Sequence, residues 1–117
     1  MKKLIIACFA AIVLFTTGTA NAEARPNFRC NFSHTPSEQT ICQSVRLSQL
    51  DRRMRLSYKR LLRQMRGFRY WQDRRELRRN QLVWFSRRNR CGSNRRCLIV
   101  KYKTRIERLE GWEYGPV

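Results

Sequence analysis

The chain has 117 residues and a formal net charge of +18, since 26 lysines and arginines face only 8 aspartates and glutamates. This length allows one small domain, and the charge favours anionic over cationic partners. Arginine supplies most of the positive charge, and its guanidinium group binds phosphate and carboxylate in a bidentate geometry that lysine cannot match. Composition alone is equally compatible with a surface that is simply charged and solvated.

The N-terminus has the pattern of a secretory signal peptide. Two lysines precede an apolar run over residues 4–15, and Ala20-Asn21-Ala22 forms an A-x-A cleavage site. Twelve apolar residues are fewer than the roughly 20 that a transmembrane helix needs. We therefore predict a signal peptide over residues 1–22 and a periplasmic or secreted bacterial protein. A lipobox ending in Cys8 is the alternative, but it would leave only a short stub of apolar residues before that cysteine.

Cleavage would leave 117 − 22 = 95 residues, with 24 basic and 8 acidic side chains and a net charge of 24 − 8 = +16. Four cysteines remain, and an even number in an oxidising compartment implies two disulfides. Of the three connectivities, we favour the local pairs Cys30–Cys42 and Cys91–Cys97. The alternative, in which Cys42 reaches Cys91 or Cys97, stays open because a helical hairpin would bring these segments together.

Residues 23–34 lack periodicity and form a leader, and the helical domain is predicted over residues 35–110. Thr35-Pro36-Ser37-Glu38 combines a capping box with proline at the first helical position, which predicts a helix start. One amphipathic helix of roughly seven turns should follow and end at Gly67. Its apolar positions are Ile41, Val45, Leu47, Leu50, Met54, Tyr58, Leu61 and Met65.

A second helix is predicted from about Asp73, which would be its N-cap, to Asn89. A third helix is predicted from Asn94 or Arg95 to Glu110. Residues 111–117 form a tail. The inward positions of the second are Leu77, Gln81, Leu82, Trp84, Phe85 and Arg88, and those of the third are Leu98, Ile99, Tyr102, Ile106 and Leu109. No stretch alternates with the period of a strand. We expect an all-α fold of three antiparallel helices, a hairpin plus a third helix, held by two disulfides.

The sequence gives little support for a metal or catalytic site. Five residues separate Cys91 from Cys97, whereas zinc sites usually place two to four residues between paired cysteines. His34 is the only histidine, and no nucleophile or pair of carboxylates accompanies it. We expect a non-enzymatic protein with no metal, no cofactor and no small-molecule substrate.

The pairs Arg74-Arg75 and Arg78-Arg79 form a basic stripe on the second helix, and with Arg87 and the arginines around Cys91 and Cys97 they predict one broad cationic face that could bind a partner. Such residues could bind lipopolysaccharide phosphates, other anionic glycans or, less readily in an exported protein, nucleic acid. The alternative is a solvated basic surface without a dedicated partner. The candidates are Arg74, Arg75, Arg78, Arg79, Arg90, Arg95 and Arg96.

A further set of residues carries a family resemblance through its order along the chain. The set is Cys30, Thr35-Pro36, Glu38, Ile41-Cys42, Leu50-Asp51, Tyr58, Gln81, Trp84, Arg88, Cys91-Gly92 and Cys97-Leu98. This arrangement resembles the lysozyme inhibitor LprI family, small exported helical proteins, over about residues 28–110. The chain departs from the family pattern at Asn89, where family members usually have aspartate.

The resemblance implies a disulfide-stapled helical protein of the cell envelope that inhibits lysozyme by protein–protein contact. As a structural hypothesis, Asp51 pairs with Arg88 between the first and second helices, with Tyr58, Gln81 and Trp84 nearby. Animal c-type lysozymes are themselves basic, so like charge opposes their encounter with this chain at long range. A cationic module that binds anionic envelope polymers is therefore the alternative function.

Overall fold

The computed structural model describes residues 26, 28, 30–31 and 34–112, and this part of the chain is all-α with no strand. The expected signal peptide over residues 1–22, and residues 113–117 of the expected tail, lie outside the described residues. The elements are α1 (Pro36–Cys42), α2 (Val45–Gln64), the single 3-10 turn η1 (Phe68–Tyr70), α3 (Trp71–Asn89) and α4 (Arg95–Glu110).

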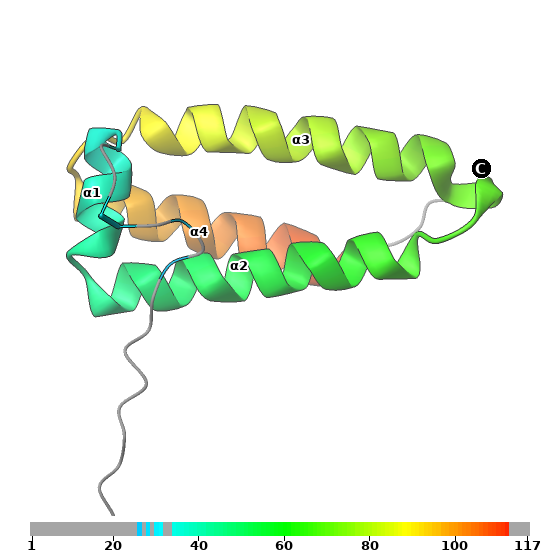
Figure 1. The fold of residues 1–117 in the computed structure, drawn as a ribbon, viewed down its shortest axis with the longest axis horizontal. Coiled ribbons are helices and arrows are strands. Elements are labelled where there is room, and N and C mark those ends of the chain that lie inside the picture. The colour runs from blue at the N-terminus through cyan, green and yellow to red at the C-terminus, as the bar shows by residue number, and fades with distance from the viewer. Residues whose placement is uncertain (1–25, 27, 29, 32–33, 113–117) are drawn as a thin grey trace, which may run out of the picture.

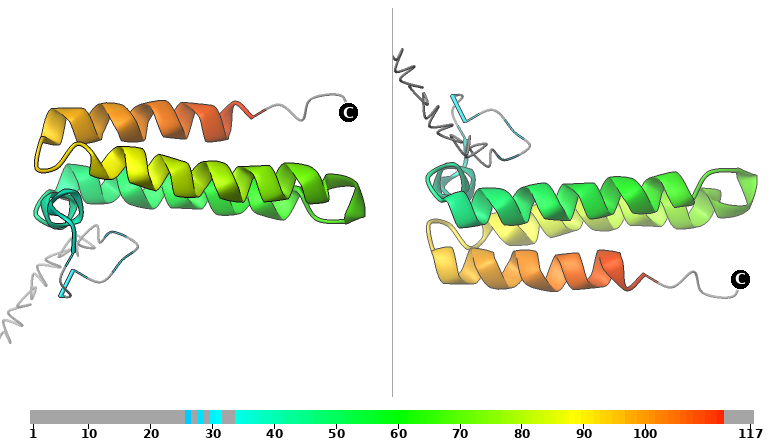
Figure 2. Two further views of the ribbon diagram at one scale, coloured as in Figure 1. Left: turned by 90° about the horizontal axis from the view of Figure 1, so that it is seen from above. Right: turned by 90° about the horizontal axis from the view of Figure 1, so that it is seen from below.

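The three long helices lie side by side, with α3 antiparallel to α2 and α4, and α1 lies across one end of the bundle (Figures 1 and 2). This confirms the predicted three-helix arrangement. The contacts between the helices are unequal: α4 packs closely along α2, whereas the backbones of α2 and α3 scarcely approach each other. The backbones of the two helices of the predicted hairpin are therefore bridged mainly by α4 and α1, while α2 and α3 contact each other directly through side chains.

The prediction of one continuous first helix is wrong. The helix that Thr35 caps ends at Cys42, and a new one begins after Ser44, whose backbone is extended (φ −123°, ψ 116°). The Ser44 hydroxyl accepts a hydrogen bond from the Leu47 backbone N–H at 3.2 Å and so caps α2. The Ile41 carbonyl at the end of α1 accepts from the Ser44 backbone N–H at 3.2 Å and from the Ser48 hydroxyl at 2.8 Å, which ties the two helices together at the break.

The break also changes which residues face the core. Val45 was predicted to point inward, but it begins α2 on the outer side and is 67% exposed. Leu82 was also predicted inward and is 70% exposed, because it lies on the side of α3 that faces the gap between α2 and α3 rather than α4. The buried apolar core is formed by Ile41, Leu47, Met54, Leu61, Met65, Leu77, Trp84, Leu98, Tyr102, Ile106 and Leu109.

The other helix boundaries lie close to the predictions. Helix α3 begins at Trp71, two residues before the predicted cap at Asp73, which instead lies within the first turn. Gly67 has φ +103°, a left-handed conformation that suits glycine and turns the chain from α2 toward η1. Asn94 caps α4 by accepting a hydrogen bond from the Cys97 backbone N–H at 3.0 Å.

Both predicted local disulfides are present. Cys30 pairs with Cys42 at a Cα–Cα separation of 5.8 Å, and Cys91 pairs with Cys97 at 5.6 Å. Disulfides persist in oxidising compartments, so this pair of bridges fits a periplasmic or extracellular protein. Among the described residues, no helix has the length and apolar character needed to cross a membrane.

Candidate functional site

A buried polar cluster centred on Arg88 joins α2, α3 and α4. The Arg88 guanidinium lies 3.8 Å from the Asp51 carboxylate, and both side chains are almost completely buried, which bears out the predicted ion pair. The Tyr102 hydroxyl lies between them: it donates to Asp51 at 2.8 Å and accepts from Arg88 Nη1 at 3.3 Å. Burial, and then the neighbouring Asp51 carboxylate, raises the pKa of Tyr102 far above its ordinary value, so its hydroxyl remains a donor.

The remaining donors of Arg88 are also engaged. Its Nε and Nη2 atoms donate to the Asn89 side-chain oxygen at 3.1 and 2.9 Å, and Nη2 lies 3.6 Å from the Glu38 carboxylate of α1. The guanidinium lies 5.1–5.9 Å from the ring centroids of Phe28, Trp84 and Phe85. Arg88 is therefore a structural residue that links all four helices, whereas the sequence predicted only its pairing with Asp51.

A second buried polar contact lies beside the first. Arg105 donates two hydrogen bonds to the Gln81 side-chain oxygen, at 3.0 and 2.8 Å, and the Gln81 amide donates to the Met54 sulfur at 3.1 Å. Trp84 packs edge-on against Tyr102, with ring centroids 5.2 Å apart. Gln81 and Trp84 thus lie in the core beside the ion pair, as the structural hypothesis stated, whereas Tyr58 is only half-buried.

Arg105 has a place in this core that the sequence analysis missed. It lies three residues after Tyr102 and seven after Leu98, so helical spacing alone would have placed it on the inner face of α4. Desolvation lowers the pKa of Arg105, but the guanidinium group still carries its charge at neutral pH. Its pairing with Gln81 rather than with a carboxylate was not visible in the sequence.

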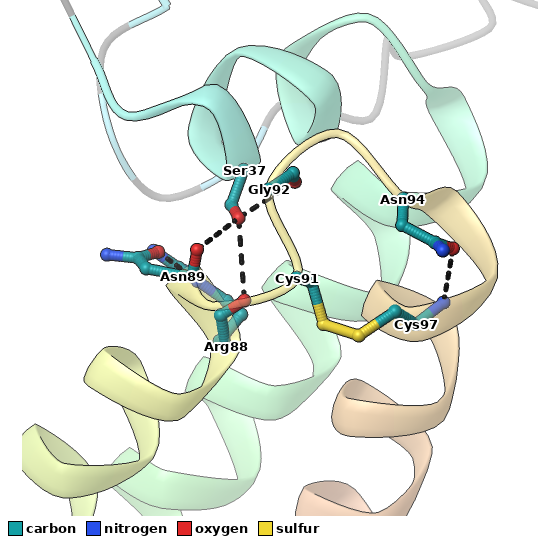
Figure 3. Close-up of a disulfide and its surroundings, with 7 residues drawn as sticks. All are labelled: Ser37, Arg88, Asn89, Cys91, Gly92, Asn94 and Cys97. Carbon is teal, nitrogen blue, oxygen red and sulfur yellow. Dashed lines mark hydrogen bonds between the residues drawn. A yellow bond between two sulfur atoms is a disulfide. The ribbon is translucent and has the colours of Figure 1, made fainter.

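The corner between α3 and α4 is braced from two directions (Figure 3). The Cys91–Cys97 disulfide closes the turn, and Gly92 adopts a left-handed conformation within it (φ +54°). The buried Ser37 hydroxyl of α1 lies 2.9 Å from the Gly92 carbonyl, and the Arg88 and Asn89 carbonyls are within 3.4 Å of it. The α1 helix therefore holds the corner in place.

The candidate arginines lie in two separate regions. All are exposed except Arg74, which is half-buried. Arg90, Arg95 and Arg96 surround the braced corner, and we call these three the basic corner. The other four lie on the opposite half of α3, and Arg74 and Arg90 are separated by 16 residues, or about 24 Å of helix. The structure therefore does not bring the seven arginines onto one continuous face.

A groove of about 730 Å³ separates α2 from α3, and the sequence analysis did not predict it. Its lining combines apolar side chains, four cations, and two acids at the α1 end. Tyr58 is half-buried in this lining, and burial raises its pKa while nearby Arg78, Arg105 and Arg74 oppose that rise. The lining residues are Phe28, Glu38, Asp51, Met54, Arg55, Tyr58, Lys59, Leu62, Arg78, Gln81, Leu82, Phe85, Arg88 and Asn89.

The described residues include no group of three or more histidine, cysteine or acidic side chains placed to hold a metal ion. The molecule thus presents two exposed features of different kinds, the convex basic corner and the concave groove between α2 and α3. Comparisons of the chain with protein-family models, with curated proteins and with solved structures gave no match.

Proposed function

We propose that this is an exported, non-enzymatic envelope protein of the lysozyme inhibitor LprI family, which acts by binding lysozyme through the basic corner. The observation that carries the proposal is the construction of that corner: three exposed arginines on a turn held by a disulfide and by α1. Because the turn is fixed before binding, little conformational entropy is lost when a partner is engaged. A convex cationic turn is complementary to a cleft that holds catalytic carboxylates.

The residues of the family resemblance support the same proposal. The resemblance was based on order along the chain, and its members Asp51, Gln81, Trp84 and Arg88 are all buried in the core of the bundle. A pattern made of such buried residues describes a scaffold, whereas Arg90, Arg95 and Arg96 are exposed to a partner. We therefore place binding at the arginines and stability at the shared residues.

Electrostatic forces between this basic protein and a basic lysozyme act in opposite directions at long and at short range. A c-type lysozyme is basic overall, so long-range repulsion slows encounter, while contact of the corner with the cleft carboxylates is attractive at short range. Salt screens the repulsion between exposed charges more strongly than it screens a buried contact. We therefore expect inhibition to persist as the salt concentration rises.

The test is lysis of a Gram-positive cell wall by c-type lysozyme with the purified, oxidised protein at low and physiological salt. Arg95→Gln/Arg96→Gln should relieve inhibition by about tenfold or more, as expected for lost charge-assisted contacts. Arg75→Gln/Arg79→Gln is the matched control, since it removes the same charge from exposed positions of α3 outside the corner. Absence of inhibition by the unmodified protein, or equal effects of the two variants, would contradict the proposal.

A second candidate function, binding of anionic envelope polymers, is favoured by the distribution of acidic residues. The described part of the chain has only six, and Asp51 is buried while Glu38 and Glu110 contact arginines. Most of the surface is therefore cationic. Binding to lipopolysaccharide and heparin should then weaken steeply with salt, because released counterions drive such binding. If binding to polyanions depends steeply on salt and lysozyme is not inhibited, this second function is favoured over the first.

A further inference from the structure

The groove between α2 and α3 has an apolar interior. Each helix contributes one stripe of residues at three- and four-residue spacing, over Asp51 to Leu62 on α2 and Arg78 to Asn89 on α3. Each stripe spans 11 residues, so the groove is about 16 Å long. Its apolar side chains are Met54, Leu62, Leu82, Phe85 and Phe28, together with the ring of Tyr58.

Charge is distributed unevenly along this groove. At the α1 end, Glu38 and Asp51 both lie within 4 Å of Arg88, so the charges there are largely balanced. The remaining charged lining residues are Arg55, Lys59 and Arg78, which are all cationic. Arg78 begins the α3 stripe, so its guanidinium lies toward the end of the groove away from α1 (Figure 1).

The exposure of Leu82 shows that the apolar surface reaches solvent. Leu82 is 70% exposed although it lines the groove, and Leu62 and Phe85 are only half-buried. Arg78 and Phe85 are seven residues apart on the same face of α3, or about 10 Å. An occupant could therefore place an anionic group at Arg78 and an apolar chain along Leu82 and Phe85.

We propose that this groove binds a single-chain anionic amphiphile, such as a fatty acid or an alkyl phosphate. Its head group pairs with Arg78 and Lys59, and its chain lies along Leu82 and Phe85 toward the α1 end. The volume of about 730 Å³ falls within the range of pockets that enclose small ligands. This site is separate from the basic corner, so the proposal goes beyond lysozyme binding and does not depend on it.

The dimensions favour an alkyl chain over an acidic helix of a partner protein. A helix is about 10 Å wide, whereas the groove is lined by a single stripe of side chains from each of two helices. A helix could therefore insert only one face, whereas a single alkyl chain can enter fully. The two side-chain stripes are close enough to form one continuous lining, which suits a narrow occupant.

The experiment is calorimetric titration of the oxidised protein with dodecyl phosphate, dodecylphosphocholine and inorganic phosphate, each below any micelle-forming concentration. We expect saturable binding of one dodecyl phosphate per chain, about tenfold tighter than the zwitterionic analogue. Inorganic phosphate should bind far more weakly, because it lacks the apolar chain. Binding of many amphiphiles per chain, or equal affinity for the two head groups, would overturn the proposal.

Two matched pairs of variants locate the site. Arg78→Gln should weaken dodecyl phosphate binding by about fivefold to tenfold, whereas Arg79→Gln, an exposed neighbour outside the groove, should leave it unchanged. Leu82→Ser should weaken it about fivefold, and Val83→Ser, on another side of α3, should not. All four side chains are at least partly exposed, so the variants should fold. The proposal would be refuted if the two variants of either pair lost equal affinity for dodecyl phosphate. It would also be refuted if the protein bound an acidic amphipathic peptide but no amphiphile.

Discussion

At the scale of single residues, Arg88 carries the largest number of long-range polar contacts in the described structure. Its guanidinium contacts Asp51, Tyr102 and Glu38, which come from three other helices. Burying a charge is costly unless a partner compensates it, so each member of the cluster depends on the others. This dependence predicts that single substitutions are more damaging than paired ones.

Arg88→Met should lower the free energy of unfolding by about 3 kcal/mol or more, because it removes a buried cation from beside the buried Asp51 carboxylate. Adding Asp51→Asn removes that charge and should restore part of the loss, with a coupling energy of about 1–3 kcal/mol. Urea denaturation of the wild type, both single variants and the double variant measures this coupling. Additive effects would show that the two residues act independently.

Glu110 provides a pH-dependent contribution at the surface. Arg53 donates hydrogen bonds to both of its carboxylate oxygens, at 3.0 and 2.9 Å, and these hydrogen bonds are the main cause of its lowered pKa. A carboxyl group with a lowered folded-state pKa stabilises the protein above its unfolded pKa of 4.5. That contribution disappears as the pH falls through the lower folded-state value.

We therefore expect Glu110→Gln to have a lower urea midpoint than the wild type at pH 7, with a difference that vanishes well below pH 4.5. The pair is exposed, so the difference should be small. Glu107→Gln, which removes the same charge from an exposed position on α4, controls for the change in net charge. A difference between Glu110→Gln and the wild type that stays constant as the pH falls far below 4.5 would contradict this assignment.

At the scale of elements, the sequence predicted the all-α class, the third helix and both disulfides, because caps and cysteine spacing are local signals. The break between α1 and α2 was missed because the apolar positions continue through it: Ile41 and Val45 keep a helical spacing across Ser44. What decides the break is long-range, since Ser37 must reach the corner after α3 and Cys42 must reach Cys30. Tertiary contacts here override a local helical pattern.

Ser44 tests whether the break is a defined feature. Ser44→Ala should destabilise the protein by about 1 kcal/mol, because it removes the N-cap of α2. Ser86→Ala is the control, since Ser86 is exposed within α3, where alanine has the higher helix propensity, and it should be neutral or slightly stabilising. Thermal or urea unfolding measures the stability of both variants. If Ser44→Ala and Ser86→Ala were equally stable, Ser44 would not act as a cap.

The candidate site was less predictable than the fold. Leu82 was predicted inward because it is apolar, and Arg105 received no inward role because it is charged, yet their exposures are the reverse. The unequal spacing of the three helices explains Leu82, since it lines a gap that only tertiary packing creates. Residue type identified the basic corner correctly as exposed, but the groove depends on geometry that the sequence does not encode locally.

At the scale of the whole molecule, the positive charge exceeds what the described acids can neutralise. Only three of the described carboxylates make ion pairs with arginine within 4 Å, at Glu38, Asp51 and Glu110. Most exposed arginines on α2, α3 and α4 therefore repel one another across a small bundle. A high net charge of one sign favours solubility and destabilises the compact state.

The whole molecule should consequently become more stable as salt increases. Raising sodium chloride from about 0.05 M to about 0.5 M shortens the screening length from more than 10 Å to less than 5 Å, which weakens repulsion between the exposed arginines. The melting temperature should rise by roughly 4–8 °C for each kcal/mol of repulsion removed. The same rise should occur in Glu110→Gln, because the surface ion pair that salt also weakens is a minor contribution. A melting temperature that falls with salt would mean that specific ion pairs, rather than the net charge, dominate the electrostatics of the fold.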